Sequence, residues 1–155
     1  MDAKYMRQAI GLSRVHMLAL QGGPFGAVIV KDGKVIAEGW NQVTSSNDPT
    51  AHAEVIAIRR ASAALKSFDL AGAELYTSCE PCPMCLSAAY WARISKIYFA
   101  NTRADAASIQ FDDDFIYQEI PKQHHERSIP IMQVLRDEAF EVFKEWDAKQ
   151  DKVKY

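Results

Sequence analysis

The sequence is poor in cysteine: only three are present, and all lie within seven residues, at positions 79, 82 and 85. Because no other cysteine can pair with them, they do not form the disulfide framework of a small secreted protein. Long apolar runs are also lacking, since no stretch approaches the roughly 18 to 20 residues that cross a bilayer. The N-terminal residues have no signal-peptide profile, so we expect a cytoplasmic protein with no membrane partner.

An excess of positive charge is lacking as well. The formal net charge is -2 at pH 7 and the pI is about 6.1. Proteins that bind a phosphate backbone need a basic surface, so we expect no nucleic-acid partner. With 155 residues, 48% of them hydrophobic, and no repeat or low-complexity tract, the chain predicts a single domain over residues 1–155.

Hydrophobic periodicity predicts alternating helices and strands after an N-terminal helix. Asp32-Gly33 is a strong hairpin signal, and Asp48-Pro49 supplies a preferred N-cap followed by a proline suited to the first helical turn. We therefore expect an α/β fold with a mixed sheet of about five strands and helices on both faces. The predicted helices cover residues 2–20, 49–65, 83–92, 103–108 and 137–148, and the predicted strands cover residues 25–30, 34–40, 73–77, 94–100 and 131–135.

Two segments carry residues that bind zinc, Ala51-His52-Ala53-Glu54 and the stretch from Thr77 to Cys85. One imidazole and two thiolates leave the fourth tetrahedral position of zinc to water, which is typical of a catalytic centre. Cys82 and Cys85 are three residues apart at a predicted helix start, where the helix dipole favours the thiolate form. We predict one Zn²⁺ per chain, held by His52, Cys82 and Cys85.

Glu54 lies two residues after the predicted ligand His52. On a regular helix such residues point about 200° apart, so the two share a site only in the first turn. Zinc lowers the pKa of bound water, and Glu54 is then placed to take the proton, so that zinc-bound hydroxide attacks an amino-bearing ring carbon. The pattern His-x-Glu followed by Pro-Cys-x-x-Cys is typical of zinc-dependent nucleobase deaminases.

Other uses of the same residues stay open at this point. A Cys-x-x-Cys pair alone would also suit a thioredoxin-like redox site, whereas an iron–sulfur cluster would need a fourth thiolate. A non-catalytic zinc module predicts four protein ligands and no use for Glu54. Cys79 is interpreted as a small buried hydrophobe. The remaining histidines, His16, His124 and His125, have no partner motif and are interpreted as structural or solvated.

Several segments together resemble one family, the small bacterial guanine deaminases of the cytidine deaminase superfamily. The resemblance implies a three-layer α/β/α sandwich of the cytidine deaminase type and the hydrolysis of guanine at C2 to xanthine and ammonia. The zinc motifs specify only the superfamily, and the acidic loop and the C-terminal tyrosine indicate guanine. The segments that carry the resemblance are Pro24-Phe25-Gly26-Ala27, residues 46–54, residues 77–85, Phe111-Asp112-Asp113, Phe115-Ile116-Tyr117 and Tyr155.

The resemblance also implies contacts with the purine. Asn41 would hydrogen-bond the ring, since an amide both donates and accepts. Phe25 and Trp91 would form apolar walls, and the backbone of Ala53 would contact the polar edge. For Phe25 and Trp91 the alternative is ordinary core packing.

The second carboxylate implied by the resemblance is Asp113, which would handle the leaving amine and a ring N–H. The alternative for Asp113 is a helix cap or a solvated acid. Its neighbours Asp112 and Asp114 are acids too, so the choice among the three rests on the resemblance.

The resemblance further implies a domain-swapped homodimer, in which residues 131–155 cross to the partner and Tyr155 closes the partner's site. The aromatic stripe Phe140, Phe143 and Trp146 would belong to the swapped helix. The same fold could instead act on guanosine, on another aminated purine or triazine, or on adenosine in transfer RNA.

Overall fold

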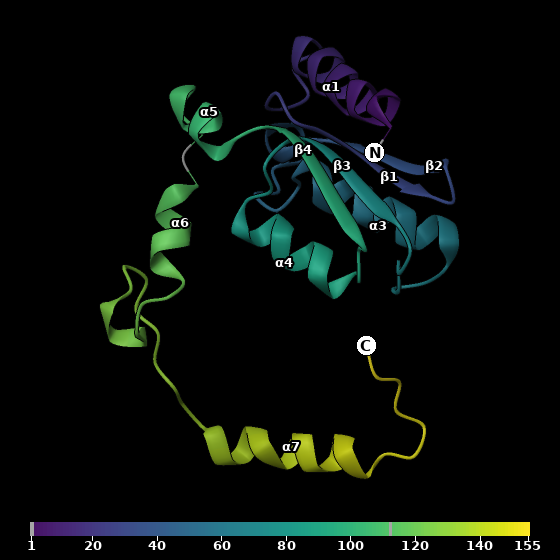
Figure 1. Cartoon of the computed structure of the whole chain (residues 1–155). Coiled ribbons are helices and arrows are strands. Elements are labelled where there is room, and N and C mark those ends of the chain that lie inside the picture. Colours follow the sequence, from purple (N-terminus) through teal and green to yellow (C-terminus); the bar gives the residue numbers. More distant parts are fainter. Residues whose placement is uncertain (1, 112) are drawn as a thin grey trace. The chain divides into compact units, whose positions relative to one another are not determined.

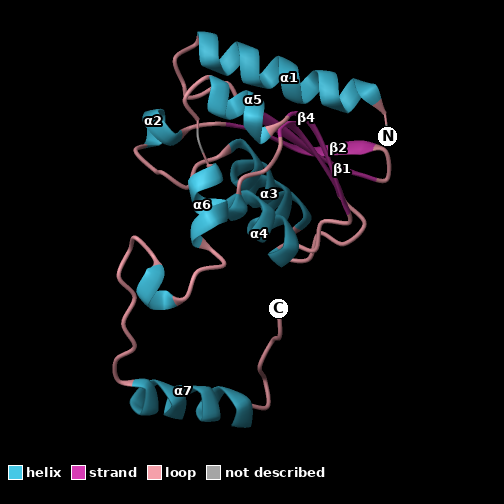
Figure 2. Ribbon diagram, turned by 60° about the vertical axis from the view of Figure 1, so that its left-hand side comes forward, coloured by secondary structure: helices cyan, strands magenta, loops and turns pink. Residues whose placement is uncertain are grey.

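The computed structural model describes residues 2–111 and 113–155, and the chain forms two compact units, Met1–Asp114 and Phe115–Tyr155. Figures 1 and 2 show the course of the chain. The elements are α1 (Ala3–Leu18), β1 (Gly26–Lys31), β2 (Lys34–Trp40), α2 (Val43–Ser46), α3 (Ala53–Leu65), β3 (Glu74–Cys79), α4 (Pro83–Trp91), β4 (Lys96–Asn101), α5 (Arg103–Ser108), α6 (Asp114–Glu119), a 3-10 turn η1 (His124–Glu126) and α7 (Arg136–Ala148).

The sheet of the first unit is mixed, as predicted, with strand order β2-β1-β3-β4. Strand β1 runs antiparallel to β2 and β3, and β3 runs parallel to β4. The expected fifth strand at residues 131–135 is wrong, because these residues adopt no strand and the described sheet has four strands. A strand needs a neighbour to complete its hydrogen-bond ladder, and the described part of the second unit contains no strand.

Alternate residues of β1 enter two different cores. Ala27 and Ile29 face α3 and α4, and Val28 and Val30 face α1 on the other side of the sheet. This alternation follows from the two-residue period of a strand. The result is a three-layer α/β/α sandwich, which confirms the predicted fold class (Figure 1).

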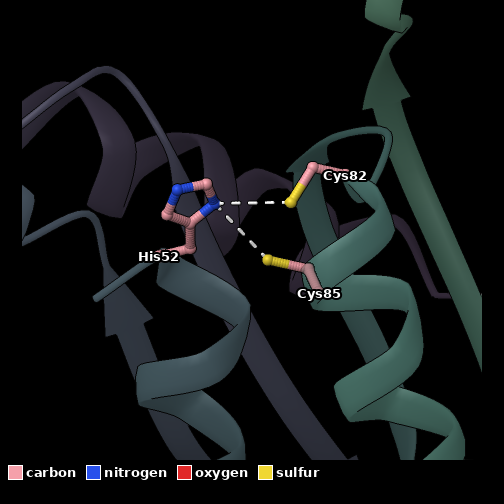
Figure 3. A group of neighbouring side chains, drawn as sticks. All are labelled: His52, Cys82 and Cys85. Carbon is pink, nitrogen blue, oxygen red and sulfur yellow. Dashed lines mark hydrogen bonds between the residues drawn. The ribbon is translucent and has the colours of Figure 1, made fainter. Parts of the chain in front are cut away.

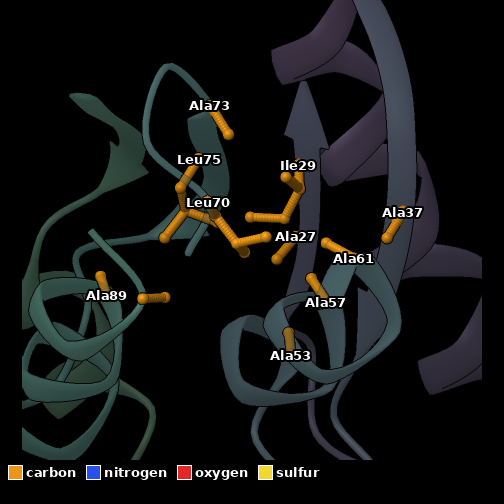
Figure 4. Close-up of a cluster of buried hydrophobic side chains, with 11 residues drawn as sticks. Ala27, Ile29, Ala37, Ala53, Ala57, Ala61, Leu70, Ala73, Leu75 and Ala89 are labelled. Carbon is orange, nitrogen blue, oxygen red and sulfur yellow. The ribbon is translucent and has the colours of Figure 1, made fainter. Parts of the chain in front are cut away.

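The core between the sheet and α3 is built largely from alanine. Three alanines at spacings of four residues on α3 let the helix lie close to β1 and β2 (Figure 4). Gly39 on β2 extends this close approach, since a Cβ there would lie 2.1 Å from the carbonyl oxygen of Ala53. The start of α3 is therefore fixed tightly against the end of β2. The α3 residues in this core are Ala53, Ala57 and Ala61.

The hairpin between β1 and β2 confirms the prediction from Asp32-Gly33. Both residues have positive φ angles, 51° and 71°. This is the backbone that a two-residue type I′ turn requires, and its twist matches that of the flanking strands.

Helix α3 begins later than the sequence predicts. Asp48 does not cap it, because its carboxylate accepts from the backbone N–H and the hydroxyl of Thr50. That local turn competes with helix formation, as short acidic side chains often do. The helix instead begins at Ala53, and His52 occupies the N-cap position with extended backbone angles.

The second unit contains α7, and no residue of this helix is buried. Its aromatic side chains are substantially exposed, at 39% for Phe140, 69% for Phe143 and 46% for Trp146. No helix in the described residues is both long and apolar enough to cross a membrane.

Candidate metal centre and active site

Three side chains from the starts of two helices meet at one point. His52 precedes α3, Cys82 is the N-cap of α4, and Cys85 lies in the first turn of α4. The Nδ1 atom of His52 lies 3.6 Å from the Cys82 Sγ and 3.5 Å from the Cys85 Sγ. Figure 3 shows the three side chains pointing toward one another. The two helix starts converge, as the sequence predicts.

These separations can be tested against zinc coordination. Zn–N bonds of about 2.1 Å and Zn–S bonds of about 2.3 Å at a tetrahedral angle place nitrogen and sulfur about 3.6 Å apart. The observed separations of 3.5 and 3.6 Å match this value. The three ligand atoms all lie within 4.8 Å of one another. The residues are positioned to hold one zinc ion through His52 Nδ1 and two sulfurs.

The electrostatics of the cluster also suit a cation. A hydrogen bond from the Cys85 thiol lowers the pKa of Cys82 to about 4, with a further contribution from His52. The hydrogen bond to Cys82 raises the pKa of His52 in turn. The hydrogen bond to Cys82 and burial raise the pKa of Cys85. At neutral pH Cys82 is therefore a thiolate and Cys85 keeps its proton, which a divalent cation displaces when it binds.

Glu54 lies beside this cluster and is only 6% exposed. Its Oε1 accepts from the Thr77 hydroxyl at 3.0 Å, and its Oε2 lies 3.4 Å from the Cys85 Sγ. Burial raises the pKa of this carboxyl group. A carboxyl group whose charged form is disfavoured, beside a metal site, is suited to receive and return a proton.

Cys79 is not a member of the group of three possible ligands. It is buried, and its thiol donates to the Thr102 carbonyl oxygen at 3.6 Å. Burial raises its pKa to about 11, so it stays protonated at neutral pH. This environment agrees with the interpretation of Cys79 as a small buried residue and not a ligand.

Asn41 follows β2 and is only 6% exposed. Its Oδ1 accepts from the backbone N–H of Gly23 at 3.1 Å and from that of Val43 at 3.3 Å. The two lone pairs of this oxygen are thereby used, and the amide N–H₂ is left for another partner. The sequence could not predict this orientation of the amide, because one of the two donors, Gly23, lies 18 residues before Asn41.

Phe25 packs edge-on against Phe111, with ring centroids 5.0 Å apart and an interplanar angle of 89°. This contact links the segment before β1 to the start of the acidic loop, and it stabilises both beyond the area that it buries. Ala53 is fully buried at the start of α3. The predicted contacts of Phe25 and Ala53 with a purine stay predictions.

The aspartates of the acidic loop have different electrostatic surroundings. Asp113 is half-buried, and burial raises its pKa, with the Cys82 thiolate adding to the effect. The Asp113 charge in turn raises the pKa of His52, so the carboxylate lies within electrostatic reach of the metal ligands. Asp114 instead forms an ion pair with Arg103 at 3.9 Å. Asp112 lies outside the described residues.

Comparison with known proteins places this arrangement in a family. The model of the cytidine and deoxycytidylate deaminase zinc-binding region matches residues 1–101, which include all three ligands and Glu54. The chain belongs to this family.

Three relatives illustrate the breadth of the deaminase family. Guanine deaminase from Bacillus subtilis is 52% identical over 151 residues, 97% of each chain, and its X-ray structure has a TM-score of 0.97 over 100% of this chain and 99% of that one. The structure of guanine deaminase from Nitrosomonas europaea has a TM-score of 0.70 at 30% identity, over 96% of this chain and 86% of that chain. A tRNA-specific adenosine deaminase from Agrobacterium fabrum is 42% identical over 102 residues, 66% of each chain.

Two further site residues of this deaminase, Trp91 and Tyr155, keep their predicted roles as predictions. Trp91 is the last residue of α4 and is 68% exposed. At a rise of 1.5 Å per residue it lies about 9 Å along the helix from Cys85, and its contact with a purine stays a prediction. Tyr155 belongs to the second unit and is 72% exposed.

Sequence reasoning did not single out Thr77 as the residue that holds the Glu54 carboxylate. Its signal was a polar residue inside a strand whose other members are mostly apolar. A buried hydroxyl needs a hydrogen-bond partner, and Glu54 supplies it.

Zinc content tests the assignment of the ligands. We expect Cys85→Ser to lose most of the roughly one equivalent of zinc per chain, because a serine hydroxyl is a poor ligand at neutral pH. The matched variant Cys79→Ser should retain it, since Cys79 bonds to Thr102. Plasma emission spectrometry of dialysed protein measures both, and loss of zinc in Cys79→Ser would contradict the assignment.

Proposed function

We propose that this protein is a zinc-dependent guanine deaminase that hydrolyses guanine to xanthine and ammonia. The observation that carries the proposal is the likeness to the Bacillus subtilis guanine deaminase, which extends over 97% of both chains at 52% identity. The cluster of His52, Cys82 and Cys85 with the buried Glu54 supplies the chemistry that such a reaction needs.

The extent of the likeness favours guanine over adenosine in transfer RNA. The two guanine deaminase structures match 96% and 100% of this chain, whereas the tRNA-specific adenosine deaminase matches 66%. The net charge of -2 also disfavours a polynucleotide substrate, because backbone binding depends on a surplus of lysine and arginine.

Glu54 carries the proton transfers in this proposal. When bound, zinc acts as a Lewis acid that brings the pKa of a coordinated water toward neutrality. Glu54 takes a proton from the attacking water and delivers it to the ring nitrogen next to the amino-bearing carbon. Thr77 donates to Oε1 and so orients the carboxylate.

Asp113 is the second carboxylate, and it assists the departure of ammonia. Its electrostatic coupling to Cys82 and His52 supports this role over Asp114, which is paired with Arg103. Asn41 presents its amide N–H₂ to an acceptor on the purine, since its oxygen already accepts two backbone N–H groups. Ammonia leaves as the C–N bond breaks, and the oxygen of water remains as the new carbonyl.

The C-terminal segment completes the enzyme as a domain-swapped homodimer in this proposal. Helix α7 has no buried residue, and its three aromatic side chains are 39% to 69% exposed, which is unusual for a helix that has no further partner. A second copy of the chain would cover this stripe, and Tyr155 would then close the partner's purine site. A cytoplasmic location agrees with reduced cysteine ligands.

Turnover of guanine tests the proposed reaction. Zinc-loaded protein should convert guanine to xanthine in an ultraviolet assay, and Glu54→Gln should lower kcat by about 10² to 10⁴-fold, because the amide cannot carry the proton. Guanosine, adenine and a triazine analogue are assayed in parallel. Turnover of guanosine but not of guanine would contradict the assignment of guanine as the substrate. Full activity of Glu54→Gln would contradict the role of Glu54 in proton transfer.

A pair of variants tests which acid assists the leaving amine. Asp113→Asn should lower kcat for guanine by about 10²-fold, since it removes a proton-transfer group. Asp114→Asn is the matched control and should stay within about threefold, because the ion pair of Asp114 with Arg103 is exposed to solvent. The opposite order of effects would move the role to Asp114.

Mixing two inactive chains tests the swap. One chain carries Glu54→Gln with an intact Tyr155, and the other has intact Glu54 but ends at residue 154. If Tyr155 acts in the partner's site, the co-expressed chains should recover about a quarter of wild-type activity, because half of the dimers are mixed and one site in each mixed dimer is complete. Recovery of no activity would show that Tyr155 acts within its own chain, and full activity of the chain that ends at residue 154 by itself would show that Tyr155 is not needed.

A further inference from the structure

Trp40, the last residue of β2, is held between two side chains from opposite layers of the fold. The His16 imidazole from α1 stacks on one face of the indole, with ring centroids 3.6 Å apart and an interplanar angle of 4°. The Arg60 guanidinium from α3 lies over the Trp40 ring at 4.3 Å from its centroid. Both are favourable contacts for an indole, which combines dispersion with attraction between a cation and the ring.

Arg60 is held in place by a second contact, since its guanidinium donates to the Glu38 carbonyl oxygen at 2.9 Å. The indole N–H of Trp40 is buried and has no hydrogen-bond partner among the described residues. The position of the indole therefore depends on the contacts that His16 and Arg60 make with its faces. Trp40 precedes Asn41 directly, so the orientation of the ring bears on the backbone that carries Asn41.

His16 has a second contact that leads to the same residue. Its Nδ1 lies 2.8 Å from the Gln21 Oε1, and the Gln21 carbonyl oxygen accepts from the Ser45 hydroxyl at 2.6 Å. Gln21 begins the loop of residues 21–24 that follows α1. The His16 imidazole thus contacts both the indole of Trp40, which directly precedes Asn41, and the loop of residues 21–24, which packs against Asn41.

This loop is pressed against Asn41. A Cβ at Gly22 would lie 2.0 Å from the Asn41 carbonyl oxygen, so only glycine permits the approach. The next residue, Gly23, donates its backbone N–H to Asn41 Oδ1. The contact that leaves the Asn41 amide N–H₂ for a ligand therefore depends on the position of a loop that His16 holds.

We propose that His16 and Trp40 are positioning residues for purine recognition, which hold the Asn41 amide with its N–H₂ group toward the purine. His16 acts through the loop of residues 21–24, and Trp40 acts through the backbone that it shares with Asn41. The inference rests on the proposed function for the identity of the ligand, whereas the coupling of His16 to Asn41 is a property of the protein alone. Neither side chain touches the purine. Their effect is to fix a donor before the ligand arrives, which lowers the free energy lost on binding.

Nuclear magnetic resonance of the zinc-loaded protein without substrate tests the coupling. The side-chain N–H₂ resonances of Asn41, assigned with Asn41→Asp, should shift in His16→Ala. They should return only part of the way in His16→Phe, which keeps a ring over Trp40 but loses the contact with Gln21. The ring protons of His16 should also be displaced upfield by the indole. Met6→Ala is the control, because Met6 is half-buried on the same helix about 15 Å nearer its start.

Kinetics with guanine test the consequence for recognition. His16→Ala and Trp40→Leu should each raise KM about tenfold, which corresponds to about 1.4 kcal/mol, while kcat stays within about threefold. Trp40→Phe should recover most of the affinity, and His16→Phe only part of it, because phenylalanine keeps the stacking but not the contact with Gln21. Zinc content should be that of the wild type. A variant that is merely less stable would lose active protein and kcat without this selective change in KM.

The two experiments separate the inference from the proposed function. Wild-type protein that does not turn over guanine would contradict the proposed function, and the Asn41 resonances would still decide the coupling. Unchanged Asn41 resonances in His16→Ala would overturn the coupling itself. Shifted resonances with an unchanged KM would overturn the role in purine recognition.

Discussion

The convergence of two helix starts is the constraint on which the rest of the structure depends. A zinc ion bound by one nitrogen and two sulfurs requires separations of about 3.6 Å, and these ligands come from segments 30 and 33 residues apart. Both ligand segments lie where a helix begins and the backbone is still extended, as the angles of His52 and Cys82 show. Side chains at such positions can point past the helix end, so that two helices can share one ion.

The sheet makes this convergence possible. Helices α3 and α4 pack on the same face through small residues, chiefly alanine, and Gly39 lets β2 approach the first turn of α3. Asn41, the proposed purine donor, directly follows the same strand, and the β3 residue Thr77 donates to Glu54. On the other face, α1 supplies His16, which contacts Trp40 and Gln21. Every layer of the sandwich thus contributes either to the metal centre or to the residues proposed to position Asn41.

The ligand set, the fold class and most of the element bounds could be predicted from the sequence. The hairpin at Asp32-Gly33 was predictable because a type I′ turn depends on two adjacent residues. The prediction of an N-cap at Asp48 was wrong because the Asp48 carboxylate forms a turn with Thr50. The preference of aspartate for N-cap positions takes no account of such a competing turn. The fifth strand was wrong because an apolar pattern at residues 131–135 does not supply a neighbouring strand.

The sequence by itself determined the reaction chemistry, since the donor atoms of His52, Cys82 and Cys85 and the carboxylate of Glu54 have their properties in any fold that brings them together. Only the tertiary structure decided how neighbouring side chains are used: Asp113 feels the charge of Cys82 whereas Asp114 pairs with Arg103, and the Asn41 oxygen is filled by Gly23 and Val43. These outcomes depend on contacts between residues that are often distant in the sequence. Local propensity carries no information about such contacts, because it describes a residue and its immediate neighbours.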